Sequence, residues 1–323
     1  MTAIAHDSRS LSTPVAESRL ASGLTLALIS AASFGLSGPL ARGLIDTGWS
    51  PGAVVLARVG IAAVVVLPLG LLALRGRWRL MRRNAGLILF YGMVAVAGAQ
   101  FCYFSAVSHI QVGPALLIEF TAPAAVVVWL WLRHGQRPGA LTLVGAVLAG
   151  LGLVLVLDVL SGADLSTAGV LWALAAMVGA TSYFVISADQ GNGLPPLALA
   201  AGGLVVGTLA LVLLGLVGAL SMDTARLPAT YAGADFDWWM PLVALGLVTA
   251  ALSYTTGIAA GRRLGSRLAS FVALLEVLAG IGFAWLLLDE LPRLIQLAGG
   301  ALILAGVVAV RLGERNVVRA ATR

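Results

Sequence analysis

The feature that most constrains this chain is a succession of long apolar runs, each about as long as a membrane-spanning helix. Crossing the roughly 30 Å hydrocarbon core of a bilayer takes about 20 helical residues. A helix also satisfies its own backbone hydrogen bonds, which no water satisfies inside the bilayer. We therefore predict ten transmembrane helices, at residues 22–41, 52–74, 85–107, 112–132, 139–157, 167–187, 196–220, 238–260, 268–288 and 294–311.

The composition agrees with a membrane protein. Hydrophobic residues make up 60% of the 323 and charged residues 11%, whereas a soluble domain carries about 25% charged residues. The 20 basic residues are all arginines, and most of them lie in short loops between apolar runs or in the two tails. This placement indicates orientation in a membrane and not a nucleic-acid partner.

The sequence offers no cofactor or metal site. Cys102 is the single cysteine, which excludes an internal disulfide framework and a CxxC metal site. We also find no phosphate-binding glycine loop or nucleotide motif in it, so we expect no cofactor and no transport driven by ATP. The expected partners are a small-molecule substrate and membrane lipid, and a homodimer is left open.

The chain repeats itself. With a shift of 154 residues, 110–157 aligns with 264–311 without a gap, and a shift of 144 aligns positions further upstream. The informative matches are Trp131 with Trp285, Pro138 with Pro292, Gly145 with Gly299, Gly152 with Gly306, and Pro51 with Pro195. The sequence therefore divides into a flexible cytoplasmic tail (1–21), a first repeat (22–157), a second repeat (158–311) and a cytoplasmic C-terminal tail (312–323).

The arginines predict that the two repeats are inverted. Each repeat holds five helices, an odd number, so the second must enter the membrane from the opposite side. With the N-terminus in the cytoplasm, the cytoplasmic segments hold 16 arginines and the outer loops hold 3. This is the distribution that the positive-inside rule requires. We predict an integral protein of a bacterial-type cytoplasmic membrane with both termini cytoplasmic.

Two long runs resemble the halves of an EamA-type carrier of the drug/metabolite transporter superfamily. They are "EFTAPAAVVVWLWLRHGQRPGALTLVGAVLAGLGLVLVL" and "RRLGSRLASFVALLEVLAGIGFAWLLLDELPRLIQLAGGALILAGVVAV", and the resemblance covers residues 22–311. It implies a ten-helix transporter that exports amino acids or other small metabolites. One departure is that Val277 follows Glu276, where the family often has proline, while the first half has Ala122–Pro123 at the equivalent place.

Glu119 and Glu276 are the acidic residues clearly inside predicted spans. A charge at the centre of a membrane helix costs roughly 2.5–3.5 kcal/mol on insertion scales. Inverted-repeat carriers bind substrate near the midplane between their repeats, where these carboxylates would bind a cationic group or relay a proton. The alternative is a protonated glutamate, bonded to a backbone carbonyl, that holds helices together.

Arg58 is the intramembrane base, about 10 Å inside its predicted helix. It either snorkels to the interface or partners Glu119, Glu276 or a substrate carboxylate; the resemblance supports the second reading. Five further residues are candidates for lining a cavity, since buried Tyr and Trp tips need partners. They are Gln100, Tyr103, Trp172, Tyr183 and Tyr254, for which lipid-facing or helix packing is the alternative.

The stretch "GLSG", residues 35–38, matches the nucleophile motif of rhomboid intramembrane proteases. Ser37 would need a base within hydrogen-bonding reach, and none of the three histidines lies within a predicted span. Close packing of helix 1 through its glycines is the simpler interpretation, and a channel is a third class of function.

We therefore predict an all-α integral membrane protein with ten transmembrane helices in two inverted five-helix repeats. The expected function is secondary transport by alternating access around a central cavity, with helices 5 and 10 supporting the packing. We expect export of a small metabolite, such as an amino acid, coupled to protons, and no enzymatic activity.

Overall fold

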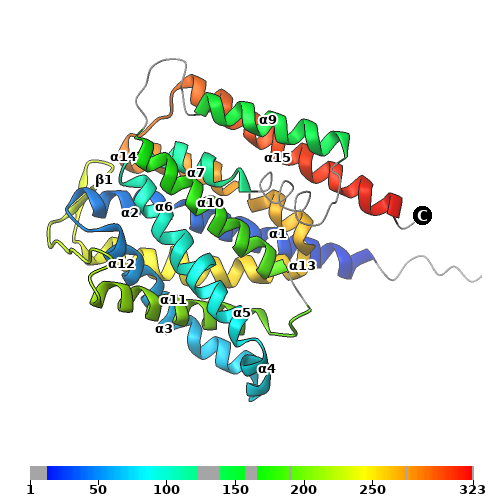
Figure 1. Ribbon diagram of the computed structural model, residues 1–323, viewed down its shortest axis with the longest axis horizontal. Helices are drawn as coiled ribbons and strands as arrows, with labels where there is room; N and C mark the ends of the chain where they lie inside the picture. Colours follow the sequence, from blue (N-terminus) through cyan, green and yellow to red (C-terminus); the bar gives the residue numbers. More distant parts are fainter. Residues whose placement is uncertain (1–12, 123–138, 157–165, 189–190, 274, 322–323) are drawn as a thin grey trace, which may run out of the picture.

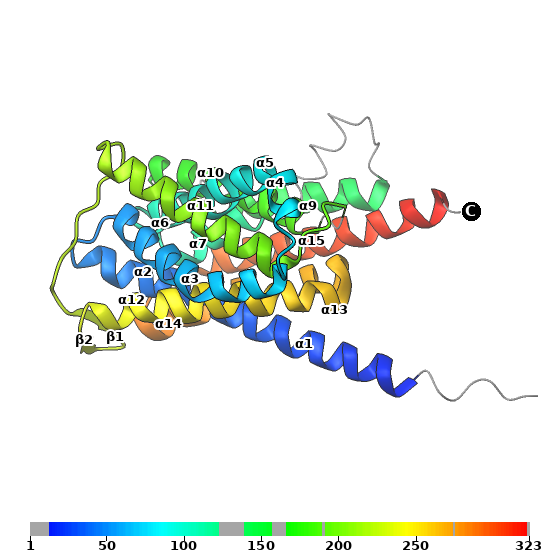
Figure 2. The same ribbon diagram turned by 90° about the horizontal axis from the view of Figure 1, so that it is seen from below.

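The computed structural model describes residues 13–122, 139–156, 166–188, 191–273 and 275–321 (Figures 1 and 2). These residues form a bundle of helices with one short β-hairpin. The first half contains α1 (Thr13–Gly35), α2 (Ser37–Asp46), α3 (Pro51–Leu74), α4 (Trp78–Arg83), α5 (Ala85–Phe90), the π-helix η1 (Tyr91–Gly98), α6 (Ala99–Val107), α7 (Val112–Glu119) and α9 (Ala140–Val156). The second half contains α10 (Thr167–Ala188), α11 (Pro196–Leu216), β1 (Ala229–Tyr231), β2 (Ala234–Phe236), α12 (Trp239–Gly246), the π-helix η3 (Leu247–Leu252), α13 (Ser253–Ala273), α14 (Leu275–Leu288) and α15 (Leu294–Ala321).

The described helices agree with an integral membrane protein. Five helical segments are long and apolar enough to cross a membrane: Ala21–Asp46, Pro51–Leu74, Ala85–Val107, Pro196–Leu216 and Trp239–Gly261. Four shorter apolar helices lie within the predicted segments 139–157, 167–187, 268–288 and 294–311. Of the predicted span 112–132, the structure describes α7 and the three residues after it, and its remainder lies outside the described residues.

Local signals explain where the second predicted span begins and ends. Ser50 caps α3 by accepting a hydrogen bond from the backbone N–H of Ala53, and Pro51 occupies the first turn, where its missing N–H costs nothing. Arg75 ends the helix in the left-handed conformation, with φ 47°. The structure therefore matches the predicted 52–74 to within one residue.

Several boundaries differ from the prediction. Helix α1 begins at Thr13, inside the predicted flexible tail 1–21, and α15 continues to Ala321, inside the predicted tail 312–323. Both extensions are rich in Ala, Arg and Glu, which favour helix whether or not lipid surrounds them. Likewise, α13 runs through the predicted turn 261–267 and ends at Ala273.

The β-hairpin corrects the all-α prediction in the loop 221–237. Strands β1 and β2 are antiparallel, with Tyr231 opposite Ala234, and the turn residues Ala232 and Gly233 both have positive φ. This is the geometry of a two-residue hairpin turn, which matches the twist of the strands. The sequence signal is weak because Ala-Gly is an uncommon pair for such a turn.

The helix contacts are symmetric under exchange of the two halves. Helix α3 packs on its repeat equivalent α11, and α9 packs on its equivalent α15. The α1–α13 contact has its counterpart in α10–α6, since α10 is equivalent to α1 and α13 continues the equivalent of α6. Figures 1 and 2 both show α9 and α15 side by side at one edge of the bundle, as expected for helices 5 and 10.

Reciprocal glycine contacts show this symmetry at atomic detail. A Cβ atom added at Gly152 of α9 would lie 2.5 Å from the carbonyl oxygen of Gly299, and one added at Gly306 of α15 would lie 2.5 Å from that of Gly145. The 154-residue shift pairs Gly152 with Gly306 and Gly145 with Gly299. The duplicated glycines therefore let α9 and α15 approach closely through equivalent contacts.

Candidate functional site

Arg58 is the one charged side chain of the described residues that is almost fully buried, with 1% of its surface exposed. It donates from Nη1 to the side-chain oxygen of Gln100 on α6, and from Nη2 to the carbonyl oxygen of Thr249 on η3, 2.6 Å away. Its Cζ lies 5.4 Å from the centre of the Phe104 ring, within cation–π range. Arg58 is thus held between the two halves of the chain and does not snorkel.

The carbonyl that Arg58 uses belongs to the π-helix η3. A π turn disturbs the regular hydrogen-bond ladder of an α-helix, which is why such segments are frequent at functional sites. The other π-helix, η1, ends at Gly98, and η3 ends at Leu252, 154 residues later. Both halves therefore carry the same irregularity at equivalent positions, two residues before Gln100 and Tyr254.

Gln100 and Tyr254 are repeat equivalents that touch, because the Tyr254 hydroxyl shares a hydrogen bond with the Gln100 side chain. The Tyr254 ring packs edge-on against Phe34 of α1 and Tyr183 of α10, at centroid distances of 5.2 and 5.8 Å. Tyr183 in turn stacks on Tyr91 at 6.1 Å. These rings form an aromatic row beside Arg58, drawn from both halves.

The two glutamates come from different halves of the chain. Glu119 is the last residue of α7, and Glu276 lies on α14. Both side chains are partly exposed and interact electrostatically with Arg58. Within the described part of the chain, neither forms a direct ion pair with Arg58 or accepts a hydrogen bond. The two carboxylates are therefore near enough to the guanidinium to interact electrostatically, but they form no direct ion pair with it among the described residues.

The second glutamate lacks the proline that the family often has after it, since Val277 follows Glu276. In the first half, α7 ends four residues before Pro123, which itself lies outside the described residues.

Two buried polar atoms beside this cluster lack hydrogen-bond partners among the described residues. They are the hydroxyl of Tyr103 and Nε of Arg58. An unsatisfied buried group costs about 1–3 kcal/mol, so such atoms indicate where water or a ligand completes the site. Gly38 leaves room for the Tyr103 ring, because a Cβ atom there would overlap its hydroxyl. This packing accounts for one glycine of the "GLSG" stretch.

Of the eight predicted site residues, Trp172 lies apart from this cluster. Its ring packs edge-on against Phe101 at 5.5 Å, and the described contacts do not join it to Arg58. The others are connected through the contacts above.

The structure brings no described base to Ser37. This serine is buried at the start of α2. His109 contacts the carbonyl oxygen of Ser105 and the hydroxyl of Ser108 through Nδ1, and His6 and His134 lie outside the described residues. The described geometry gives no support to a serine–histidine pair.

Two hydrogen bonds join the two halves near α2, α7 and the hairpin. The Glu290 carboxylate accepts a hydrogen bond from the backbone N–H of Val112, at the start of α7, at 3.0 Å. The Tyr231 hydroxyl of the hairpin donates to the Leu40 carbonyl at 2.7 Å. Burial raises the pKa of Glu290, and the hydrogen bond from Val112 and the charge of Arg42 offset this only in part.

The profile described as the EamA-like transporter family matches the chain twice, at residues 21–158 and 167–312. The chain belongs to this family. Members of the EamA-like family are transporters, so the protein is a transporter and not an enzyme, and the predicted resemblance is confirmed. The two matches also show that the chain consists of two repeats of one unit.

Curated relatives of this EamA-like protein include exporters. The chain is 27% identical over 311 residues to the threonine/homoserine exporter RhtA of Escherichia coli (strain K12), with 92% of each chain covered, and the RhtA of Escherichia coli O157:H7 matches equally. One solved crystal structure aligns with a TM-score of 0.59 and 21% identity, covering 90% of this chain and 98% of the other. That structure shows a shared fold alone.

Sequence reasoning missed several residues of the site. Phe104 follows Gln100 by four residues and therefore shares its helix face, a signal that was present. Thr249 contributes a backbone carbonyl, which every residue carries, so no residue type marks this position. Phe34 and Tyr91 resemble ordinary core aromatics until the packing of α1 and η1 is known.

Proposed function

We propose that this protein is a secondary active transporter that exports a small amphipathic metabolite, such as an amino acid, by alternating access in exchange for protons. It lies in a bacterial-type cytoplasmic membrane as ten helices in two inverted five-helix repeats, with both termini in the cytoplasm. The observation that carries the proposal is Arg58, buried between the halves beside two uncommitted glutamates.

The cluster matches the charges of an amino acid. Arg58 receives the substrate carboxylate, since a guanidinium binds carboxylates through paired N–H donors and its Nε is unoccupied. Glu119 or Glu276 receives the ammonium group, and the carboxylate left without substrate carries the exchanged proton. The aromatic row of Tyr254, Tyr183 and Phe34 supports the apolar part of the substrate.

The name of the relative supports the substrate class. RhtA is called a threonine/homoserine exporter, and both compounds carry one carboxylate, one ammonium group and a short polar side chain. We infer a substrate of this kind.

The inverted arrangement is supported by the contact symmetry of the halves and by the predicted division of arginines, 16 against 3. A direct check uses single cysteines, Ser8→Cys and Thr322→Cys, in a Cys102→Ser background. A membrane-impermeant maleimide applied to right-side-out and inverted vesicles should label both positions from the cytoplasmic face. Labelling from opposite faces would contradict ten helices.

The transport test is counterflow in proteoliposomes. Vesicles loaded with unlabelled threonine or homoserine should accumulate labelled substrate transiently, because a carrier exchanges substrate across the membrane. Arg58→Gln, Glu119→Gln and Glu276→Gln should each reduce this overshoot, while Asp237→Asn, an exposed position near the hairpin, serves as the matched control.

Two results would contradict the proposal. Flux that does not saturate and shows no counterflow would indicate a channel. Wild-type rates and wild-type pH dependence in both glutamate variants would remove the site assignment, provided that all variants elute as the same monodisperse species.

A further inference from the structure

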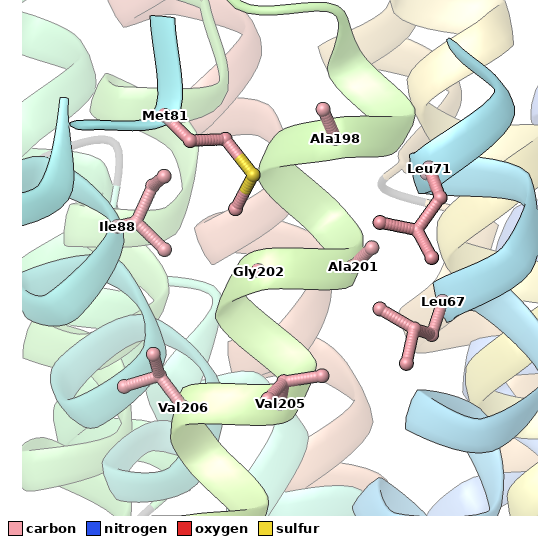
Figure 3. Close-up of a pocket in the computed structure, with 10 residues that line it drawn as sticks. Leu67, Leu71, Met81, Ile88, Ala198, Ala201, Gly202, Val205 and Val206 are labelled. Atoms are coloured by element: carbon pink, nitrogen blue, oxygen red, sulfur yellow. The ribbon is translucent and has the colours of Figure 1, made fainter. Parts of the chain in front are cut away.

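An apolar pocket lies away from the polar cluster, over the first turns of α11. The pocket has a volume of about 160 Å³, and α11 forms its floor. The C-terminal part of α3 lies on one side of it, and α4 and α5 lie on the other. Figure 3 shows the side chains of α3 and α5 flanking α11 across this pocket. The lining residues are Leu67, Gly70, Leu71, Met81, Ile88, Ala198, Ala201, Gly202, Val205 and Val206.

This lining suits hydrocarbon and not a polar substrate. Every side chain in it is apolar, and apolar cavities of about 150 Å³ stay dry and accept hydrocarbon ligands. Leu67 and Leu71 remain 38% and 42% exposed, so the pocket opens toward the surface of the bundle. In a membrane this surface faces lipid, which places an acyl chain within reach.

A cluster of arginines stands at one end of the pocket. Residues 75–83 link the two flanking helices, and they contain Arg75, Arg77, Arg79, Arg82 and Arg83 with no acidic residue. All five side chains are exposed. Arg77 donates to the carbonyls of Leu74 and Ala73, whereas the described contacts engage none of the other four guanidinium groups.

Two of the arginines lie close in the sequence to residues that line the pocket. Arg75 follows Leu71 by one helical turn at the end of α3, and Arg82 follows Met81, which lines the pocket from α4. Trp78, 53% exposed in the same segment, is a side chain typical of the membrane–water interface. The arginines suit an anionic head group, and the neighbouring pocket suits an apolar chain.

We propose that this pocket and the arginines of residues 75–83 form a binding site for an anionic phospholipid. The phosphate lies among the arginines and an acyl segment occupies the pocket over Gly202. This goes beyond the positive-inside distribution, which requires arginines on one side of the membrane but no apolar pocket beside them.

The test measures lipid binding to the purified full-length protein by native mass spectrometry. Phosphatidylglycerol and phosphatidylcholine with identical acyl chains are titrated separately. We expect phosphatidylglycerol to bind at least about fivefold more tightly, since each arginine near a membrane surface contributes about this factor toward anionic lipid. Equal binding of the two lipids would overturn the proposal.

Matched variants test each half of the site. Arg75→Gln with Arg82→Gln should abolish the preference for phosphatidylglycerol, whereas Arg226→Gln with Arg263→Gln, two exposed arginines elsewhere, should preserve it. Val205→Phe, which fills the pocket, should reduce phosphatidylglycerol binding several-fold. Val64→Phe, at a position 76% exposed on α3, should not. An equal effect of both arginine pairs, or undiminished binding to Val205→Phe, would overturn the proposal, and neither readout depends on transport.

Discussion

The two halves of the protein share their backbone irregularities but not their charged side chains. The π-helices end 154 residues apart, at Gly98 and Leu252. Arg58 of α3, however, has Gly202 of α11 as its equivalent under the 144-residue shift. Duplication preserved the shape of the helices, while the chemistry diverged.

This difference gives equivalent positions of α3 and α11 different surroundings. On α3 the position carries a cation that reaches Gln100 and Thr249 in the interior. On α11 the same position is a glycine at the floor of an apolar pocket. A symmetric scaffold thus gives an asymmetric centre, which suits the proposed substrate with its two unlike charges.

The largest expected effect is the loss of transport in Arg58→Gln. Hydrogen bonds to a charged group are worth up to about 3 kcal/mol, so we expect counterflow to fall about 100-fold. Gly202→Ala at the equivalent position should cost far less, because its added Cβ crowds Cγ2 of Ile88 at 2.8 Å but removes no hydrogen bond. Equal losses in both variants would contradict the proposed difference in function between these positions of α3 and α11.

Next in size are the glutamate variants. Glu119→Gln and Glu276→Gln should each slow counterflow about tenfold, the size of one lost interaction of ~1.4 kcal/mol, and should flatten its dependence on pH between 6 and 8. If one variant retains the wild-type pH profile, proton exchange belongs to the other glutamate alone, which would sharpen the asymmetry of the halves.

The peripheral pair α9 and α15 should instead respond symmetrically. Gly152→Val and Gly306→Val each force a side chain against a partner backbone, and we expect similar losses of about 1–3 kcal/mol in stability. Gly150→Val, where the added atoms meet open space, is the control. Thermal unfolding in detergent measures all three, and clearly unequal losses at Gly152 and Gly306 would contradict the reciprocal contacts.

The smallest expected effect is the pH dependence of stability that comes from Glu290. The pKa of Glu290 is raised above its ordinary value of 4.5 by burial, so the folded state binds this proton more tightly than the unfolded state. The contribution of Glu290 to stability is therefore greatest below pH 4.5 and declines as the pH rises through the raised pKa. Thermal unfolding from pH 4 to 8 should show this decline in wild type and in Asp289→Asn, but not in Glu290→Gln; an unchanged slope in Glu290→Gln would refute it.

Much of the fold was predictable because the bilayer imposes one length and one secondary structure on each apolar run. The span predicted at 85–107 matches α5, η1 and α6 together, although nothing in its composition distinguishes the π-helix within it. The hairpin at 229–236 was missed because it is held by contacts from afar, such as Tyr231 to Leu40.

The site was predictable where a charge stood out against an apolar background. Arg58, Glu119 and Glu276 were identified for that reason, and the structure brings them together. Their hydrogen-bond partners were less visible, because every residue carries a backbone carbonyl such as the one that Thr249 supplies. Trp172 shows the converse, since an amphipathic ring within a span lies apart from the cluster.

The most direct test of the central claim is whether Arg58 holds the substrate carboxylate. Displacement of labelled threonine from purified protein is measured with threonine and with threoninol, which lacks the carboxylate, for wild type and Arg58→Gln. Wild type should prefer threonine strongly, and Arg58→Gln should remove this preference while leaving threoninol binding nearly unchanged. A preference for threonine that persists in Arg58→Gln would contradict it.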